Sequence, residues 1–167
     1  KLIAKEQSDF FDKVFGEKSI SRMLDLNFIL QIMTTLEHGI YFSSDTEIES
    51  YIKLYNESYE NKATIYKTIT NGFHIFKSLD FKLDSIFYRK AASFTLLVEL
   101  CKKKESLDIK TLSANLNKFE ENLLKNKNKD SETNRYAQFY LYIFQGTASK
   151  KARDFRGDMI GKIIDES

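Results

Sequence analysis

The side chains that perform hydrolysis, bind metals or act as nucleophiles are sparse in this sequence. It contains two histidines, His38 and His74, far apart along the chain, and a single cysteine, Cys101. A structural zinc site needs Cys and His ligands at short spacings, and neither histidine has a second ligand nearby. We therefore expect both histidines to be structural, Cys101 to be an inert buried thiol, and no metal or cofactor to bind.

The acidic residues do not form a recognisable acid–base pair. Glu120 and Glu121 are adjacent, as are Asp165 and Glu166, so the two members of each pair would point in different directions on a helix. We expect them to lie on a solvated surface. The sequence has no glycine-rich loop for phosphate binding. Whether the intact protein is an enzyme stays open, but the sequence predicts that this chain alone is not.

Basic side chains gather in the C-terminal part of the chain, where two groups could contact phosphates. One group lies in the polar stretch 125–132, which we expect to be an exposed, mobile loop. The other lies in the first turns of the last expected helix, whose N-terminus favours negatively charged groups. The candidate nucleic-acid-binding residues, with DNA as the expected partner, are Lys125, Lys127, Lys129, Lys150, Lys151, Arg153 and Arg156.

Arg153 and Arg156, three residues apart, are expected to project from one side of that last helix, where phosphates could meet both. Asp154 and Asp158 on the same helix leave ordinary ion pairing on the surface as an equal alternative. Residues 107–124 are loosely similar to the first helix of a helix-turn-helix, but the tight turn and recognition helix that should follow are missing.

The elements that must position these side chains are predicted to be helices. The chain has 167 residues, 42% hydrophobic and 30% charged, as expected for one globular domain with a sizeable core. It contains no proline and only six glycines, so little interrupts long helices. With 14 phenylalanines and nine tyrosines, the core should be rich in aromatic rings. The formal net charge of +2 neither requires nor excludes an anionic partner.

The stretch 86–101 is the expected centre of the fold. Its charges lie only near its ends, so as a helix it would be apolar around most of its circumference and therefore buried. It is too short to cross a bilayer, which needs roughly twenty apolar residues. We predict an all-α fold in which residues 1–167 form a single compact bundle of seven to eight helices around this central apolar helix.

Apolar spacing predicts the remaining helices, and short polar residues predict where several begin. The expected ranges are 2–15, 25–38, 45–60, 63–78, 108–123, 133–145 and 149–163. Asp25, Asp108 and Ser149 are the expected N-caps, and Ser44 with Glu47 has the spacing of a capping box. With one cysteine and no visible signal peptide or membrane span, the sequence predicts a reducing, cytoplasmic setting.

Three segments of the chain, taken together, resemble one bacterial family. Residues 145–156 read Gln-Gly-Thr-Ala-Ser-Lys-Lys-Ala-Arg-Asp-Phe-Arg, a Gly-Thr turn that leads into a helix bearing arginines. Residues 20–26 place an Arg-Met pair before an apolar helix, and residues 87–97 form a centre rich in Phe and Leu. This combination resembles the helical region of the ParB-like nuclease family of bacterial defence proteins, the Gmr-type restriction subunits.

In that family the chemistry is attributed to an N-terminal ParB-like domain with an Asp-Gly-Gln-Gln-Arg signature, often beside an HNH-type nuclease domain. Neither motif occurs in this sequence, so no catalytic residue can be carried over. The resemblance implies that residues 1–167 are a helical C-terminal fragment of a restriction or phage-defence protein. That fragment would position nucleic acid or an N-terminal nuclease or NTPase domain of the same protein. The alternative is a helical protein-interaction or scaffold domain with no nucleic-acid role.

Overall fold

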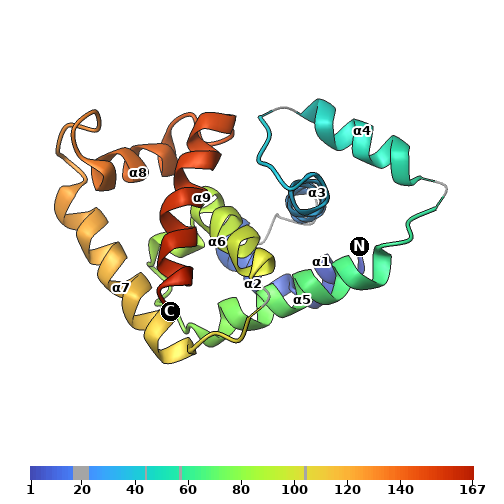
Figure 1. Ribbon diagram of the computed structural model, residues 1–167, viewed down its shortest axis with the longest axis horizontal. Coiled ribbons are helices and arrows are strands. Elements are labelled where there is room, and N and C mark those ends of the chain that lie inside the picture. The colour runs from blue at the N-terminus through green and yellow to red at the C-terminus, as the bar shows by residue number, and fades with distance from the viewer. Residues whose placement is uncertain (17–22, 44, 57, 104) are drawn as a thin grey trace.

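The computed structural model describes residues 1–16, 23–43, 45–56, 58–103 and 105–167. Within these ranges the chain forms helices and no strand, which confirms the predicted all-α class (Figure 1). The elements are α1 (Leu2–Glu6), α2 (Ser8–Phe15), α3 (Leu24–His38), α4 (Asp45–Tyr55), α5 (Lys62–Ser78), the 3-10 turn η2 (Ile86–Tyr88), α6 (Lys90–Lys102), α7 (Ile109–Asn126), α8 (Arg135–Phe144) and α9 (Lys150–Asp165).

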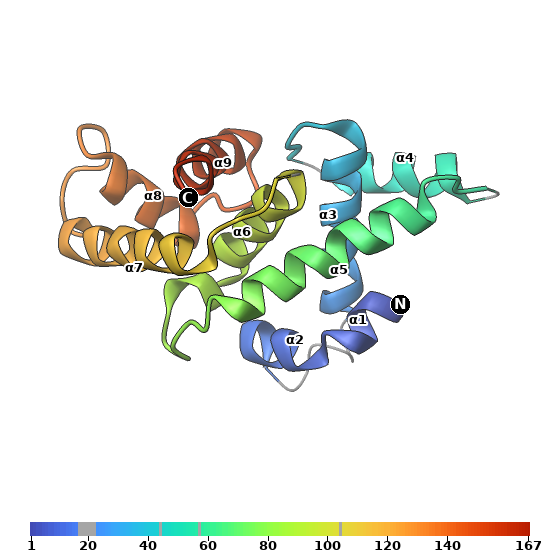
Figure 2. The ribbon, with the colours of Figure 1, turned by 60° about the horizontal axis from the view of Figure 1, so that its bottom comes forward.

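Helix α6 lies at the centre of the bundle, as predicted, and packs against α3, α5, α8 and α9 (Figures 1 and 2). Its apolar side chains are buried: Phe94 is 4% exposed, and Leu96 and Leu97 are fully covered. Each such side chain contributes about 1.5–3 kcal/mol when it leaves water, so apolar contact with α6 is a large part of what holds α3, α5, α8 and α9 together. Among the described helices none, α6 included, has the length and apolar content needed to cross a membrane.

The stretch 86–101 is not one continuous helix, which corrects the sequence prediction. Arg89 is extended, with φ −78° and ψ 132°, and separates η2 from α6. The hydroxyl of Ser93 lies within hydrogen-bond distance of two carbonyl oxygens, those of Phe87 (2.6 Å) and Arg89 (3.1 Å), and so stabilises the break. As a result Arg89 and Lys90 are exposed at the start of α6.

Two of the predicted N-caps are confirmed. The carboxylate of Asp108 accepts hydrogen bonds from the amides of Lys110 (3.0 Å) and Thr111 (3.4 Å) at the start of α7. The hydroxyl of Ser149 accepts from the amide of Ala152 (3.2 Å) at the start of α9. These bonds satisfy backbone donors that have no acceptor within the helix, which is why helices begin here.

A third predicted cap and three helix bounds are wrong. Asp25 lies inside α3, because the N-cap position is taken by Met23 in a left-handed conformation with φ 53°. The expected helix 2–15 divides at Gln7 into α1 and α2, and the expected helix 45–60 ends at Tyr55. Helix α7 continues to Asn126 and so includes Lys125. Ser44, from the expected capping box, lies outside the described residues.

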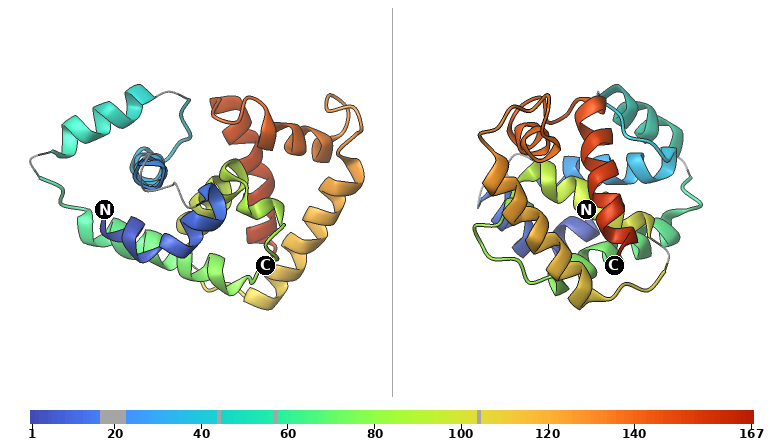
Figure 3. Two further views of the ribbon diagram at one scale, coloured as in Figure 1. Left: turned by 180° about the vertical axis from the view of Figure 1, so that it is seen from behind. Right: turned by 60° about the vertical axis from the view of Figure 1, so that its left-hand side comes forward.

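The core is rich in phenylalanine, as expected. The ring of Phe10 meets Phe73 at 5.0 Å and Phe76 at 5.2 Å, both edge to face, where α2 packs on α5. Near the other end, Phe119 and Phe139 join α7 to α8 at 4.9 Å. The left view of Figure 3 shows the molecule from behind, with α7, α8 and α9 on one side and α1, α3 and α4 on the other.

The crossing of α5 and α6 explains Gly72, a residue that weakens a helix by about 1 kcal/mol relative to alanine. A Cβ on Gly72 would lie only 2.5 Å from Sγ of Cys101. Close packing of α5 against α6 thus offsets the low helix propensity of glycine, as expected. Cys101 is buried and donates to the carbonyl oxygen of Thr68 at 3.6 Å. Burial raises the pKa of this thiol to about 12, which agrees with an inert thiol.

Candidate nucleic-acid interface

The residues considered for catalysis or metal binding do not come together. His38 and His74 are both exposed, on the last turn of α3 and on α5. In the part of the chain that the structure describes, no three His, Cys, Asp or Glu side chains are placed to hold a metal ion. Glu120 is not simply solvated, which corrects one prediction: its carboxylate accepts from the hydroxyl of Ser85 (2.8 Å) and the amide of Ile86 (2.7 Å).

The seven predicted nucleic-acid-binding residues divide into exposed lysines and buried arginines. The exposed group is Lys125, Lys127, Lys129, Lys150 and Lys151. Arg153 is 6% exposed and Arg156 is completely covered, so the expectation that they project together from the surface of α9 is wrong. The reason is that this side of α9 faces the core, between α6 and the segment that follows α3.

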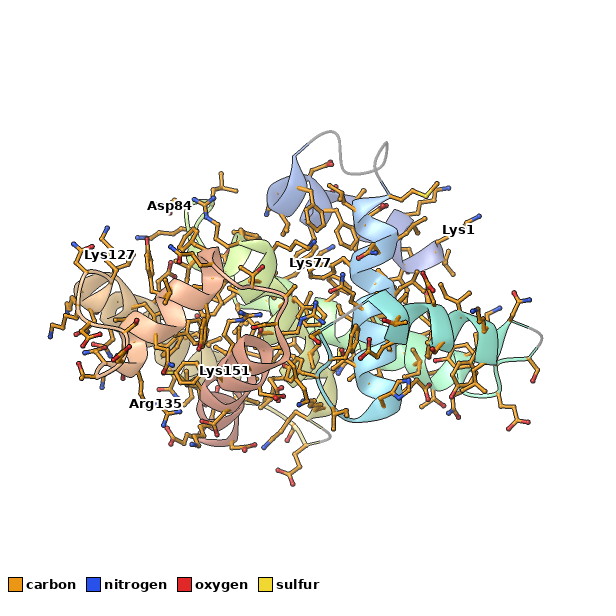
Figure 4. All side chains as sticks on the ribbon, turned by 90° about the horizontal axis from the view of Figure 1, so that it is seen from above. Lys1, Lys77, Asp84, Lys127, Arg135 and Lys151 are labelled. Carbon is orange, nitrogen blue, oxygen red and sulfur yellow. The ribbon has the colours of Figure 1, made fainter. Side chains whose placement is uncertain are left out.

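The five lysines do not form one patch. Figure 4 shows Lys127, on the connection between α7 and α8, well apart from Lys151 on α9. Lys150 forms an ion pair with Asp154 at 2.6 Å, so the alternative of ordinary ion pairing holds for this residue. The other four lysines have no carboxylate within 4 Å among the described residues.

Arg153 connects α9 to α3 and to the segment that follows it. Its guanidinium lies against the rings of Phe42 (5.0 Å) and Phe94 (4.9 Å). It donates to the carbonyl oxygen of Phe42 at 2.9 Å and to Oε1 of Gln31 at 2.7 Å. An arginine stacked between rings and hydrogen-bonded in this way stabilises packing as well as carrying charge.

Arg156 holds the end of α8 and the turn before α9. Its Nε donates to Oγ1 of Thr95 (3.1 Å), and its two terminal nitrogens donate to the carbonyl oxygens of Tyr142 (2.6 Å) and Thr147 (2.8 Å). All three acceptors are neutral, and no described carboxylate lies within 4 Å. Burial, helped by the charge of Arg153, lowers the pKa of Arg156 to about 10, so the guanidinium stays charged at neutral pH.

Both arginines line a cavity of about 400 Å³, which we call the arginine cavity. Its walls are the side of α3, the first residues of α6 and the turn at Thr147 and Ala148. Lys90 lies at its edge, and none of the described residues that line it is acidic. The cavity is therefore a positively charged hollow whose polar neighbours are amides and hydroxyls.

A second hollow, also of about 400 Å³, lies along α8 and contains two of the predicted lysines. Lys127 and Lys129 line it together with Tyr140 and Phe144, because the connection after α7 folds back along α8. Phe144 is 50% exposed, and its ring lies 5.0 Å from that of Tyr140. An exposed ring beside unpaired lysines is the combination by which proteins bind single-stranded nucleic acid.

Hydrogen bonds hold that connection in place. The backbone amide of Asn134 donates to the carbonyl oxygen of Asp130 at 3.0 Å, and the carboxylate of Asp130 accepts from the amide of Glu132 at 2.9 Å. The side-chain amide of Asn134 donates to Oδ1 of Asn126 at 3.2 Å, which connects the turn to α7. Of the stretch 125–132 that was predicted to be an exposed, mobile loop, residues 127–130 and 132 are exposed, but these bonds give the connection a defined conformation.

The two hollows are neighbours. The guanidinium of Arg89 lies 5.9 Å from the ring of Phe144, and Lys90 next to it lines the arginine cavity. Gln145 lines the hollow along α8, while Thr147, two residues later, lines the arginine cavity. We refer to the following six residues as the basic–aromatic face: Lys127, Lys129, Tyr140, Phe144, Arg89 and Lys90.

Sequence reasoning identified two members of this face and missed four. Arg89 and Lys90 are the charges near the start of the apolar stretch 86–101, but only the break before α6 shows that they face solvent. Phe144 belongs to an apolar pattern that predicts burial for the whole helix, and it is exposed because it is the last residue of α8.

The family resemblance stays a prediction. Of the three segments that carry it, the first residues of the Arg-Met segment, up to Arg22, lie outside the described residues. The other two correspond to η2 with α6 and to the turn with the start of α9. No family model matches the chain, and comparisons with curated proteins and with solved structures also gave no match.

Proposed function

We propose that this chain is a non-catalytic module that positions a nucleic-acid strand on the basic–aromatic face. The observation that carries the proposal is the hollow along α8, which is lined by two exposed lysines without carboxylate partners and by the exposed ring of Phe144. Lysines there would neutralise phosphates, and each contact would release counterions.

Phe144 favours a strand with unpaired bases over a complete duplex. Stacking of a base on an aromatic side chain contributes about 1–3 kcal/mol, and a paired base offers its face only at a helix end. The guanidinium of Arg89 lies 5.9 Å from the same ring and adds a positive charge there. The basic–aromatic face thus combines a stacking surface with phosphate contacts in one short groove.

The biological setting of this proposal is supported by the resemblance to the ParB-like nuclease family. In a restriction or phage-defence protein of that kind, a helical module would present DNA to a nuclease or NTPase domain of the same protein. The non-catalytic role is supported by the inert environment of Cys101 and by the exposure of both histidines on separate helices.

The proposal is tested by fluorescence anisotropy with a labelled single strand and the matching duplex over a series of salt concentrations. We expect the single strand to bind more tightly. The double variant Lys127→Gln/Lys129→Gln should reduce the slope of log affinity against log salt by about 1.4, since each phosphate contact of a single strand contributes about 0.7. The matched control Lys77→Gln/Lys82→Gln removes two exposed lysines of another surface and should leave the slope unchanged.

A second candidate function, protein docking, has one observation in its favour. An apolar groove of about 720 Å³ lies where α1, α3 and α5 meet, lined by Leu2, Ile29, Met33 and Ile65 among others, and Leu2 is 59% exposed. An exposed apolar groove of this size suits an apolar protein segment. Absence of strand binding at about 50 mM salt, where phosphate contacts are strong, would favour this scaffold function over the first proposal.

A further inference from the structure

Arg156, which lines the arginine cavity, carries a buried positive charge, and no carboxylate of the described residues lies within 4 Å to neutralise it. Arg156 is completely covered, and its three hydrogen bonds go to neutral oxygens. A buried charge is unfavourable unless an opposite charge or a full set of hydrogen bonds compensates for it. Each of the three nitrogens of the guanidinium has a neutral acceptor, and no described carboxylate lies within 4 Å, so the positive charge beside the cavity lacks a counter-ion and favours an anion there.

The N-terminus of α6 opens into the same cavity. Arg89 occupies its N-cap position with no capping side chain, and the first turn has no acidic residue. The amides of Lys90, Ala91 and Ala92 therefore have no acceptor within the helix, and the first two of these residues line the cavity. This thirteen-residue helix adds a dipole that favours an anion at the same place as Arg156.

The remaining walls suit a compact, highly charged anion. Asn27, Gln31 and Ser43 contribute amides and a hydroxyl, and Lys90 lies at the opening. Phosphate forms strong, charge-assisted hydrogen bonds with arginine and with helix amides. A cavity of about 400 Å³ has room for a phosphate group with part of a nucleotide attached.

We propose that the arginine cavity binds a phosphate monoester, and that this group is the terminal phosphate of the strand lying on the basic–aromatic face. The assignment of the strand as the source rests on the proposed function. A free nucleotide offers the same monoester and is the other source to be distinguished. The cavity adjoins Phe144 through Gln145 and Thr147, so one strand can reach both hollows.

The test compares two single strands of identical sequence, one with a 5′-phosphate and one with a 5′-hydroxyl, both labelled at the 3′ end. Hydrogen bonds to charged groups are strong enough that the phosphorylated strand should bind about tenfold more tightly. In parallel, inorganic phosphate and adenosine monophosphate are titrated at constant ionic strength, and the amide resonances of Ala91, Thr147 and Ala148 are followed by NMR.

The variant used is Ala148→Glu, because Ala148 is exposed at the edge of the cavity and outside the core. Its new carboxylate should abolish the tenfold preference and the phosphate-induced shifts. Ala148→Gln, which has the same size without the charge, should keep both. This pair avoids substituting Arg156, whose loss would also release the end of α8.

The outcomes of these experiments distinguish failure of the phosphate site from failure of the proposed nucleic-acid binding. If strands bind equally well with either end, and phosphate leaves the three amides unmoved, the phosphate site is overturned while nucleic-acid binding stands. If strands do not bind but phosphate or the mononucleotide moves those amides, the proposed function fails and the cavity is a site for a free nucleotide. If Ala148→Glu and Ala148→Gln behave alike, the effect does not come from the charge of this cavity and the inference is wrong.

Discussion

Gly157 of α9 faces the ring of Tyr41 so closely that a Cβ on Gly157 would lie 2.5 Å from Cε2 of Tyr41. Tyr41 is buried, and its hydroxyl donates to Oε1 of Glu99 on α6 at 2.7 Å. Because Gly157 has no side chain, the segment after α3 can insert the ring of Tyr41 between α6 and α9.

Substitution Gly157→Ala should destabilise the fold by about 1–3 kcal/mol, because the added methyl group would overpack the buried ring of Tyr41 and force it to shift. Gly161→Ala is the matched control one turn further along α9, where the Cβ would lie at 3.4 Å from Oε2 of Glu99. There the better helix propensity of alanine, up to about 1 kcal/mol, should balance or exceed the tighter contact. Urea titrations that give equal losses for the two variants would contradict this account of Tyr41.

Substitution Phe94→Ala should cost about 3–5 kcal/mol through lost burial and the cavity left behind. Phe94 is 4% exposed and contacts the rings of Phe28 (5.9 Å) and Tyr41 (6.1 Å) as well as Arg153. The comparison is Leu124→Ala on α7, which is 46% exposed and should change the free energy of unfolding by less than about 0.5 kcal/mol. A loss below about 1 kcal/mol for Phe94→Ala would show that the core lies elsewhere.

Stability should fall in alkaline solution partly through Cys101. Burial raises its pKa to about 12 in the folded protein, whereas the unfolded thiol ionises near its ordinary value of 9.0. The contribution of the protonated Cys101 thiol to folding stability is complete below pH 9. It is lost as the pH rises toward 12, because between these values only the unfolded chain releases the proton. The variant Cys101→Ala should therefore lose stability more slowly between pH 9 and 11, by up to about 1.4 kcal/mol for each pH unit. Parallel curves for the two proteins would exclude this contribution.

Substitution Arg156→Met should destabilise the protein by at least about 2 kcal/mol, because the carbonyl oxygens of Tyr142 and Thr147 lose their donors in a buried site. Lys151→Met, on the exposed side of the same helix, should have an effect within about 0.5 kcal/mol. Thermal unfolding of both variants measures the difference. A stable Arg156→Met protein would mean that this guanidinium does not hold the turn between α8 and α9.

The sequence predicts most of the fold because its signals are local. The apolar spacing of Phe28, Ile29 and Ile32 fixes the buried side of α3, and short polar side chains fix the starts of α7 and α9. The break at Arg89 was missed because it depends on a hydroxyl, that of Ser93, reaching back six residues to a carbonyl. Helix propensity alone contains no such information.

The candidate site was predicted less well because the direction of a side chain depends on distant partners. Arg153 and Arg156 have the charge of a phosphate-binding pair, but their direction is set by what α9 packs against, including Gln31 and Thr95. The hollow along α8 depends on how the segment 127–134 folds back, which rests on the turn around Asp130. Neither relationship can be read from spacing along the chain.

The contacts of Arg153 have a consequence for how the protein is made. Its partners Phe42 and Gln31 lie 111 and 122 positions earlier in the chain, and α6 depends on the same last helix for one of its largest contact surfaces. A ribosome synthesises these helices in order, so the apolar side of α6 and the ring of Tyr41 stay open to water until the sixteen residues of α9 have emerged. The bundle therefore cannot complete its core before α9 has been translated, and a nascent chain stalled before Lys150 would expose apolar surface that is prone to aggregation.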